Sequence, residues 1–185
     1  GDARRIPARG RGLFRGRFAV RRAGGGRLRR AAASRTTRTA RAGGAVTFIA
    51  RLGRDMFGDQ ALAGFVADGI NVKHVVRDPA APSGVALIFV ARNGENSIAV
   101  ASGANARLAP ADLQRAQAAF RRAAVVVLQL ETPLPTVTAA VKLAARAGAR
   151  VILNPAPARP LPASLLRHVY LLTPNESEAQ LLTGM

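Results

Sequence analysis

Four polar residues follow short apolar runs in the second half of the chain, and their types could bind a sugar or a metal ion. Glu131 follows VVVLQL, Asn154 ends RVILN, and Asn175 and Glu178 stand three residues apart after VYLLTP. A carboxylate can accept hydrogen bonds from sugar hydroxyls, and a Glu near phosphates can hold Mg²⁺ through water. The same Asn and Glu spacing is also typical of a helix start, with Asn as N-cap and Glu as third helical residue. The local pattern leaves both interpretations open.

The apolar runs before these residues are predicted strands, and amphipathic helices separate them. The predicted strands are residues 45–50, 72–76, 125–130, 150–154 and 169–172, and the predicted helices are residues 57–69, 110–122, 135–147 and 178–182. Strand and helix alternate from residue 123 onward, which predicts an α/β fold with a parallel sheet flanked by helices. Ligands of such sheets bind beyond the carboxyl ends of the strands, where the four polar residues are expected.

Residues 83–102, SGVALIFVARNGENSIAVAS, interrupt this alternation. They form two extended runs around Asn93-Gly94, a dipeptide that strongly favours a hairpin turn. We expect this β-hairpin to project from the sheet as a small lid.

Most of the positive charge lies in the first quarter of the chain. Residues 1–44 contain 14 Arg, no Lys and a single acid, Asp2, whereas the whole chain carries a net charge of +18. This Arg/Gly/Ala-rich segment shows no helical or strand periodicity, so we expect it to be disordered. Three interpretations of it stay open: an RNA-binding arm, which has only Phe14 and Phe18 for stacking; an organelle transit peptide; or a frameshifted product. A secretory signal would need an apolar core that is absent here.

The remaining residues, 45–185, are long enough for one domain with a sizeable core. No run reaches the roughly 18 apolar residues of a membrane span. The chain has no Cys and only His74 and His168, which argues against disulfides, a zinc site and a hydrolase that uses Ser, Cys or His. The chemistry must therefore rest on carboxylates, amides and backbone groups.

Five motifs occur in an order and spacing that resemble the ribokinase-like (PfkB-type) carbohydrate kinases: LGRDMFGDQALAGFVADGI, SGVALIFVARNGENSIAVASGAN, LQLETP, LNPAPARPLP and LLTPNESEAQLLTG. The resemblance covers about residues 45–185. It implies a Rossmann-like ribokinase fold with a hairpin lid, and ATP-dependent phosphorylation of D-ribose to ribose 5-phosphate with Mg²⁺ and an activating K⁺. Another sugar or nucleoside kinase of this fold is the alternative. A nucleic-acid-binding protein that uses the Arg-rich arm is a less favoured one.

The same resemblance implies roles for single residues. Glu131 corresponds to the glutamate that binds ribose hydroxyls, and Ala86 and Ile88 correspond to lid positions that close over the sugar. Asn175 corresponds to the asparagine near the ATP phosphates, and Glu178 ends the Asn-x-x-Glu motif that organises Mg²⁺. Family members often dimerise through the lid sheet, and we expect a cytoplasmic protein.

Several family motifs are absent from the sequence. The first strand with its Gly-x-x-Asn-x-Asp motif and the Gly-Gly-Lys-Gly-x-Asn loop are not found in residues 1–44. We therefore favour a frameshifted product for residues 1 to about 42, with the family frame resuming near Gly43. The Gly-x-Gly-Asp anion hole, whose Asp is the general base, is expected beyond Met185. The fold is accordingly expected to be incomplete in this chain, with negligible activity.

Overall fold

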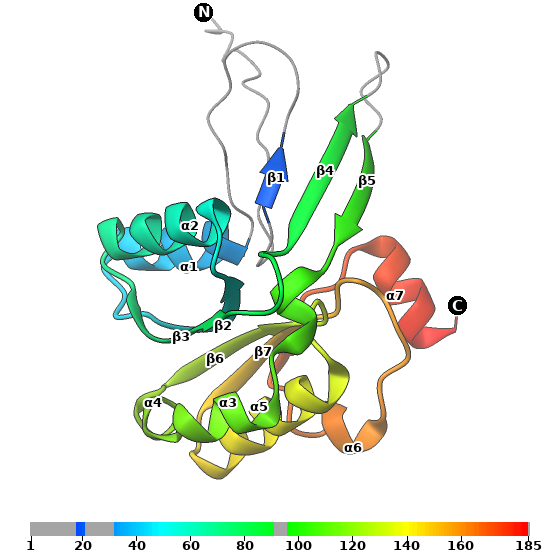
Figure 1. Cartoon of the computed structure of the whole chain (residues 1–185). Coiled ribbons are helices and arrows are strands. Elements are labelled where there is room, and N and C mark those ends of the chain that lie inside the picture. The colour runs from blue at the N-terminus through cyan, green and yellow to red at the C-terminus, as the bar shows by residue number, and fades with distance from the viewer. Residues whose placement is uncertain (1–17, 21–31, 91–95, 185) are drawn as a thin grey trace, which may run out of the picture.

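The computed structural model describes residues 18–20, 32–90 and 96–184, and within them it contains three small sheets with helices packed around them (Figure 1). The strands are β1 (Phe18–Val20), β2 (Thr47–Gly53), β3 (Asn71–Asp78), β4 (Val85–Val90), β5 (Asn96–Ala101), β6 (Val125–Gln129), β7 (Arg150–Asn154) and β8 (Leu171–Leu172). The helices are α1 (Ala32–Arg41), α2 (Met56–Ala67), the 3₁₀ helix η1 (Gly103–Arg107), α3 (Pro110–Arg115), α4 (Gln117–Arg122), α5 (Leu134–Arg146), α6 (Ala163–Leu166) and α7 (Glu176–Thr183).

The largest core lies in the second half of the chain. Strands β6, β7 and β8 pair in parallel in that order, and α3, α4 and α5 cover one face of this sheet (Figure 1). Apolar residues at helical spacing on α5, among them Val137, Val141 and Ala144, pack against Val151 and Leu153 of β7. The parallel sheet flanked by helices that the sequence predicted is thereby confirmed.

A second parallel pair, β2 and β3, comes from the first half of the chain and packs on α2. Leu52 of β2 and Phe65 of α2 are buried together, and the rings of Phe48 and Phe65 lie 4.8 Å apart between centroids. Ile49 of β2 contacts the larger core, so the two halves of the molecule share apolar contacts. The sequence predicted one parallel sheet; in the described residues it is divided into two.

The predicted lid hairpin is confirmed. Strands β4 and β5 pair antiparallel in continuous register from Val85 opposite Ala101 to Val90 opposite Asn96, and they project from the body of the molecule (Figure 1). The Asn93-Gly94 turn lies outside the described residues. The backbone of β1 pairs in parallel with β4, which makes β4 the central strand of a three-stranded sheet.

The expectation of disorder for residues 1–44 is wrong for α1. Arg41 at its end forms an ion pair of 2.7 Å with Asp68, and Thr37 donates a hydrogen bond of 2.9 Å to the same carboxylate. Tertiary contacts at the end of α2 therefore stabilise a helix that the composition did not indicate. Strand β1 also falls in this segment. The rest of residues 1–31 lies outside the described part.

Other departures are local. The helix predicted near residues 110–122 is two helices that meet at Ala116, a residue fully buried against the core. Helices η1 and α6 were not predicted, because four or five residues are too few to show a helical period. None of the described helices is long and apolar enough to cross a membrane.

Candidate active site

The carboxyl ends of β6, β7 and β8 meet at one edge of their sheet. Gln129 of β6 lies opposite Asn154 of β7, and Leu153 lies opposite Leu172 of β8. Glu131 follows the first of these strand ends by two residues, and Asn175 follows the last by three. The structure therefore brings Glu131, Asn154 and the start of α7 to the same edge, as the sequence predicted.

Asn154 connects two of these strand ends. Its side chain is 7% exposed, and its Nδ2 donates a hydrogen bond of 2.7 Å to the carbonyl of Thr173, in the turn that leads from β8 to Asn175. The Oδ1 atom of Asn154 is buried and accepts no hydrogen bond from the described residues. A neighbouring bond of 3.0 Å from the Leu130 amide to the Ala156 carbonyl connects the ends of β6 and β7. These bonds fix the turns that carry Glu131 and Asn175.

Glu131 lies between the end of β6 and the start of α5. Its side chain is partly buried, and the Oε2 atom is inaccessible to solvent. Hydrogen bonds are stronger in a partly buried site than in water, so a carboxylate there binds hydroxyl groups more strongly than an exposed carboxylate does. The position therefore suits recognition of a polyol.

Asn175 and Glu178 form the helix cap that their spacing predicted. Asn175 Oδ1 accepts a hydrogen bond of 2.8 Å from the Glu178 amide, and Glu178 Oε2 accepts one of 2.9 Å from the Asn175 amide. Within the described part of the chain the Nδ2 group of Asn175 makes no hydrogen bond, so it can donate to a ligand. Glu178 is buried, and its negative charge stands in the first turn of α7. The cap leaves one amide donor of Asn175 for another partner.

The two lid positions lie on the central strand of the hairpin sheet, apart from the carboxyl edge. Ala86 is buried and lies opposite Val100 of β5, and Ile88 lies opposite Ile98. The side chain of Ile88 lies outside the described part. The structure thus places both residues on β4 and neither on the sheet that carries Glu131.

Asp55, at the start of α2, binds the segment that enters the hairpin. Its Oδ1 accepts hydrogen bonds of 2.7 Å from the Gly58 amide and 2.7 Å from Ser83 Oγ, and its Oδ2 accepts one of 2.6 Å from the Ser83 amide. Burial alone would raise the pKa of Asp55, but the hydrogen bonds from Ser83 and Gly58, with the charge of Arg77, hold this pKa below its usual value. The role of Asp55 was not predicted from the sequence, although an Asp directly before a helical run is a usual N-cap signal.

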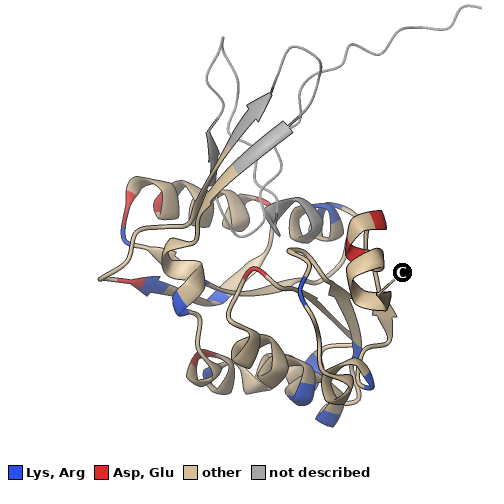
Figure 2. Ribbon diagram, turned by 90° about the vertical axis from the view of Figure 1, so that its right-hand side faces the viewer, with Lys and Arg blue, Asp and Glu red and all other residues tan. Residues whose placement is uncertain are grey.

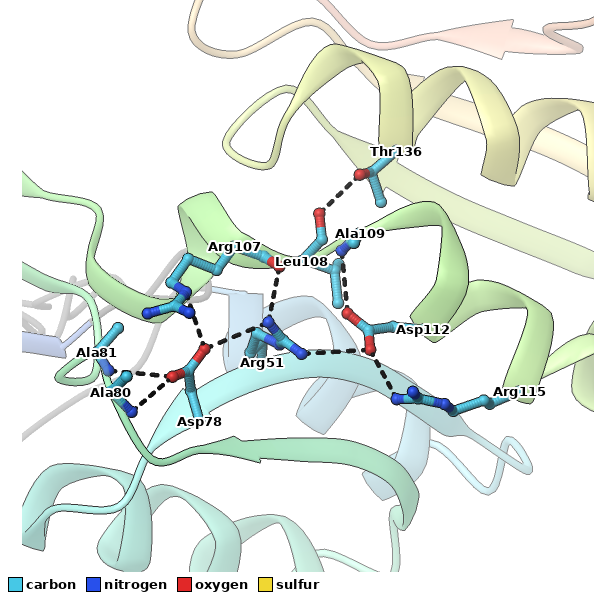
Figure 3. Close-up of polar contacts among 10 residues, drawn as sticks. All are labelled: Arg51, Asp78, Ala80, Ala81, Arg107, Leu108, Ala109, Asp112, Arg115 and Thr136. Carbon is cyan, nitrogen blue, oxygen red and sulfur yellow. Dashed lines mark hydrogen bonds and ion pairs between the residues drawn. The ribbon is translucent and has the colours of Figure 1, made fainter.

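Figure 3 shows an ion network around two buried carboxylates, Asp78 and Asp112. Asp78, at the end of β3, accepts backbone hydrogen bonds from Ala80 and Ala81 and pairs with the guanidinium groups of Arg51 and Arg107. The hydrogen bond from Ala80 is the main cause that holds the pKa of Asp78 below its usual value, with further lowering from Arg107, Ala81 and Arg51 against the effect of burial. This network was also not foreseen; the only local signal was an Asp before a Pro-containing turn.

Charge is distributed unevenly over the described residues (Figure 2). The start of α7 carries Glu176 and Glu178, whereas α4 and α5 end in Arg121, Arg122 and Arg146. No group of three or more His, Cys, Asp or Glu residues in the described ranges could by itself enclose a metal ion. A metal held here would need ligands from a bound substrate, as Mg²⁺ commonly takes them from phosphates.

The model of the pfkB family carbohydrate kinases matches residues 23–185. The chain belongs to the PfkB family of carbohydrate kinases. The match begins at residue 23, so the family resemblance extends about twenty residues further toward the N-terminus than the motifs indicated. Helix α1 lies inside it.

Three relatives illustrate this PfkB membership. The chain is 42% identical to the bifunctional ribokinase/ribose-5-phosphate isomerase A of Fructilactobacillus sanfranciscensis, over 83% of this chain and 28% of that protein. It is 40% identical to the deoxyribokinase of Salmonella typhi, over 76% of this chain and 46% of that protein. Arabidopsis thaliana ribokinase, solved in complex with ribose and ATP, superposes with a TM-score of 0.73 at 28% identity, over 83% of this chain and 50% of that one. The chain thus spans half or less of the length of each of these PfkB relatives.

Proposed function

We propose that the complete protein is an ATP-dependent sugar kinase that transfers a phosphoryl group to the primary hydroxyl of D-ribose and yields ribose 5-phosphate. The observation that supports this most is the carboxyl edge of β6, β7 and β8, where Glu131 and the Asn175/Glu178 cap lie at adjacent strand ends. The names of the relatives add support, because two of the three proteins described above are named as ribokinases.

In this proposal Glu131 accepts hydrogen bonds from ribose hydroxyls. Its partly buried carboxylate has the charge and the placement for that role. Ala86 and Ile88 of β4 would cover the sugar when the hairpin lies over the edge of the sheet. A cover of this kind excludes water from the phosphoryl acceptor.

Asn175 would bind ATP phosphates with its available Nδ2 group, at a helix start whose dipole also favours negative charge. Glu178 would hold Mg²⁺ through water; a carboxylate oxygen is a ligand that Mg²⁺ prefers, and one or two such carboxylates usually suffice when phosphates supply the rest. Bound Mg²⁺ neutralises charge on the transferred phosphoryl group. Cap and ligand site are therefore compatible functions of the same two residues.

The remaining parts of the proposal rest on family resemblance. They are an Asp general base and an anion hole in sequence beyond Met185, activation by K⁺, a homodimer formed through the hairpin sheet, and a cytoplasmic location. No described residue is assigned to K⁺.

The test is an assay of the complete, purified gene product with ATP and Mg²⁺ against ribose, 2-deoxyribose, fructose, adenosine and 2-keto-3-deoxygluconate. We expect the highest kcat/KM with ribose. The deoxyribokinase relative makes 2-deoxyribose the most informative competitor. If the protein phosphorylates another sugar or nucleoside but not ribose, the proposed substrate is wrong and the proposed class of enzyme is right. Absence of any phosphoryl transfer would overturn the proposal.

A further inference from the structure

The β4–β5 hairpin joins the body of the molecule through two short segments, which we call its incoming stem, residues 79–84, and its outgoing stem, residues 102–109. The orientation of the hairpin depends on how these two stems are held. Asp78 of β3 binds both stems, and Arg51 of β2 binds the outgoing stem (Figure 3). Asp55, just before α2, binds the incoming stem.

The incoming stem is bound by two carboxylates. Asp78 Oδ1 accepts hydrogen bonds of 2.9 Å and 3.0 Å from the amides of Ala80 and Ala81. Asp55 accepts two from Ser83, whose Oγ in turn accepts a hydrogen bond of 3.0 Å from the Gly53 amide of β2. These contacts fix the backbone up to the residue before Gly84.

The outgoing stem is bound along its length. The Ala104 amide donates a hydrogen bond of 2.8 Å to the Pro82 carbonyl, which joins the two stems. Arg107 Nε lies 3.3 Å from Asp78 Oδ2, and the Leu108 carbonyl accepts a hydrogen bond of 2.6 Å from Thr136 Oγ1 of α5. Asp78 therefore contacts both stems at once.

Arg51 lies at the centre of this arrangement, on β2. Its Nη1 atom lies 3.3 Å from Asp78 Oδ2 and donates a hydrogen bond of 3.0 Å to the Arg107 carbonyl, and its Nη2 atom lies 3.5 Å from Asp112 Oδ1 of α3. The side chains of Asp78 and Asp112 are only 1% and 3% exposed, against 20% for Arg51. Without Arg51, Asp78 would keep an ion pair only with the half-exposed Arg107, and Asp112 only with the exposed Arg115. A buried carboxylate that loses a partner is strongly unfavourable, so the stems would shift to bring water or another donor to it.

We propose that Arg51 is a positioning residue for the hairpin. Its guanidinium group binds β3, the outgoing stem and α3 together and so sets the angle at which β4 leaves the body. The last step rests on the proposed function: because β4 carries Ala86 and Ile88, this angle determines where the lid lies over the sugar. A planar group with several fixed donors is suited to such a junction, whereas a lysine offers one point charge.

The test compares Arg51→Met with Arg51→Lys in the complete gene product, by hydrogen exchange of backbone amides and by steady-state kinetics. Arg54→Met is the matched control, because Arg54 is exposed on the segment that follows β2 and its side chain makes no ion pair with the described residues. With Arg51→Met we expect about tenfold faster exchange in peptides from residues 79–109 and unchanged exchange in peptides from residues 125–154. The KM for ribose should rise about tenfold, whereas the KM for ATP should stay within about twofold of the parent value. Arg51→Lys should lie between the parent and Arg51→Met.

Unchanged exchange at residues 79–109, or equal acceleration in all peptides, would overturn the proposal, since the second result would report only a less stable protein. If Arg51→Met does not fold, Arg107→Met takes its place: it removes a half-exposed partner of Asp78 and should also accelerate exchange only in residues 79–109. Parent-like exchange in that variant would count equally against the proposal. If the parent enzyme turns over no ribose, the proposed function fails, and the exchange data alone decide the role of Arg51.

Discussion

Among single residues, Asn175 has two roles that can be separated. Its Oδ1 caps α7, and its Nδ2 is a candidate hydrogen-bond donor to a phosphate of ATP. Asn175→Ala removes both, so we expect a loss of about 1 kcal/mol in the free energy of unfolding together with weaker ATP binding. Asn175→Asp keeps the capping oxygen but places a negative charge where Nδ2 would meet a phosphate. It should retain stability and lose ATP affinity. Urea unfolding and calorimetric titration with ATP measure the two effects; an Asn175→Asp variant that binds ATP like the parent would contradict the phosphate role.

Glu131 is predicted to act on one substrate only. Glu131→Ala in the complete protein removes a hydroxyl acceptor, and we expect kcat/KM for ribose to fall about 10²-fold while ATP affinity changes little. Glu131→Gln keeps an acceptor oxygen of the same shape without the charge and should lose less. Steady-state kinetics with each substrate varied in turn would check this. Equal losses for ribose and ATP would show that Glu131 supports the fold and does not bind the sugar.

Asp55 predicts a dependence of stability on pH. Because the pKa of Asp55 is lower in the folded protein than in the unfolded chain, its stabilising effect is complete above the unfolded value of about 3.9 and is lost as the pH falls through the folded value. Urea midpoints measured from pH 7 to pH 3 should therefore decrease less steeply in Asp55→Asn than in the parent. Asp78 has a pKa shifted in the same direction, so some slope should persist in the variant. Parallel curves for the two proteins would disprove a special environment for Asp55.

At the scale of elements, the sequence predicted those whose local signal and tertiary role agree. The helix predicted at residues 135–147 is α5, Leu134–Arg146, followed by Gly148 with a φ of 73°, and the strand predicted at residues 150–154 has the observed bounds. Both predictions follow from the apolar period and the position of the glycine. Helix α1 could not be predicted in this way, because its stabilising partner Asp68 lies 27 residues from Arg41 in sequence. The candidate site followed the same division. The strand ends and the helix cap could be predicted from neighbouring residues. The contacts of Asn154 with Thr173 and of Arg51 with Asp112 could not, because they join residues 19 and 61 positions apart in sequence.

The close contact of the two hairpin stems gives a prediction for Gly84. A Cβ atom at residue 84 would lie 2.6 Å from the Ser102 carbonyl oxygen, so Gly84→Ala must push the stems apart. We expect a loss of about 1–3 kcal/mol in the free energy of unfolding. Gly148→Ala is the matched control: a Cβ there meets nothing within 4 Å but takes a positive φ of 73°, which should cost about 1 kcal/mol. Urea unfolding of both variants tests this, and a smaller loss for Gly84→Ala than for Gly148→Ala would contradict the close packing.

At the scale of the whole molecule, the first quarter of the chain keeps two interpretations. The family match from residue 23 and the contacts of α1 with Asp68 place part of this segment within the kinase domain. The family's Gly-Gly-Lys-Gly-x-Asn loop is nevertheless absent from its residues. The missing loop favours a frameshift in residues 1 to about 42, whereas the family match over residues 23 to 42 argues against one, because a shifted frame would change the side chains that the family pattern requires. The coding DNA read in three frames decides this: a family-type loop in another frame supports the frameshift, and its absence from every frame excludes it.

Residues 1–185 can be produced by themselves and tested for solubility and activity. Within the described residues β6 pairs with β7 only, so its other edge presents unpaired backbone groups, and Val125 and Val127 are 47% and 53% exposed. Apolar side chains beside a free strand edge favour association with other chains, so we expect low solubility or a partly folded state. We expect no measurable phosphoryl transfer from the same polypeptide, because the residues that we propose for the two substrates, Glu131, Asn175 and Glu178, include no general base, and the rate falls steeply when an aligned group is missing. Light scattering and an ATPase-coupled assay with ribose, Mg²⁺ and K⁺ measure both properties, with the complete gene product as control. Turnover near that of the complete protein would show that residues 1–185 already contain all the groups that the reaction needs.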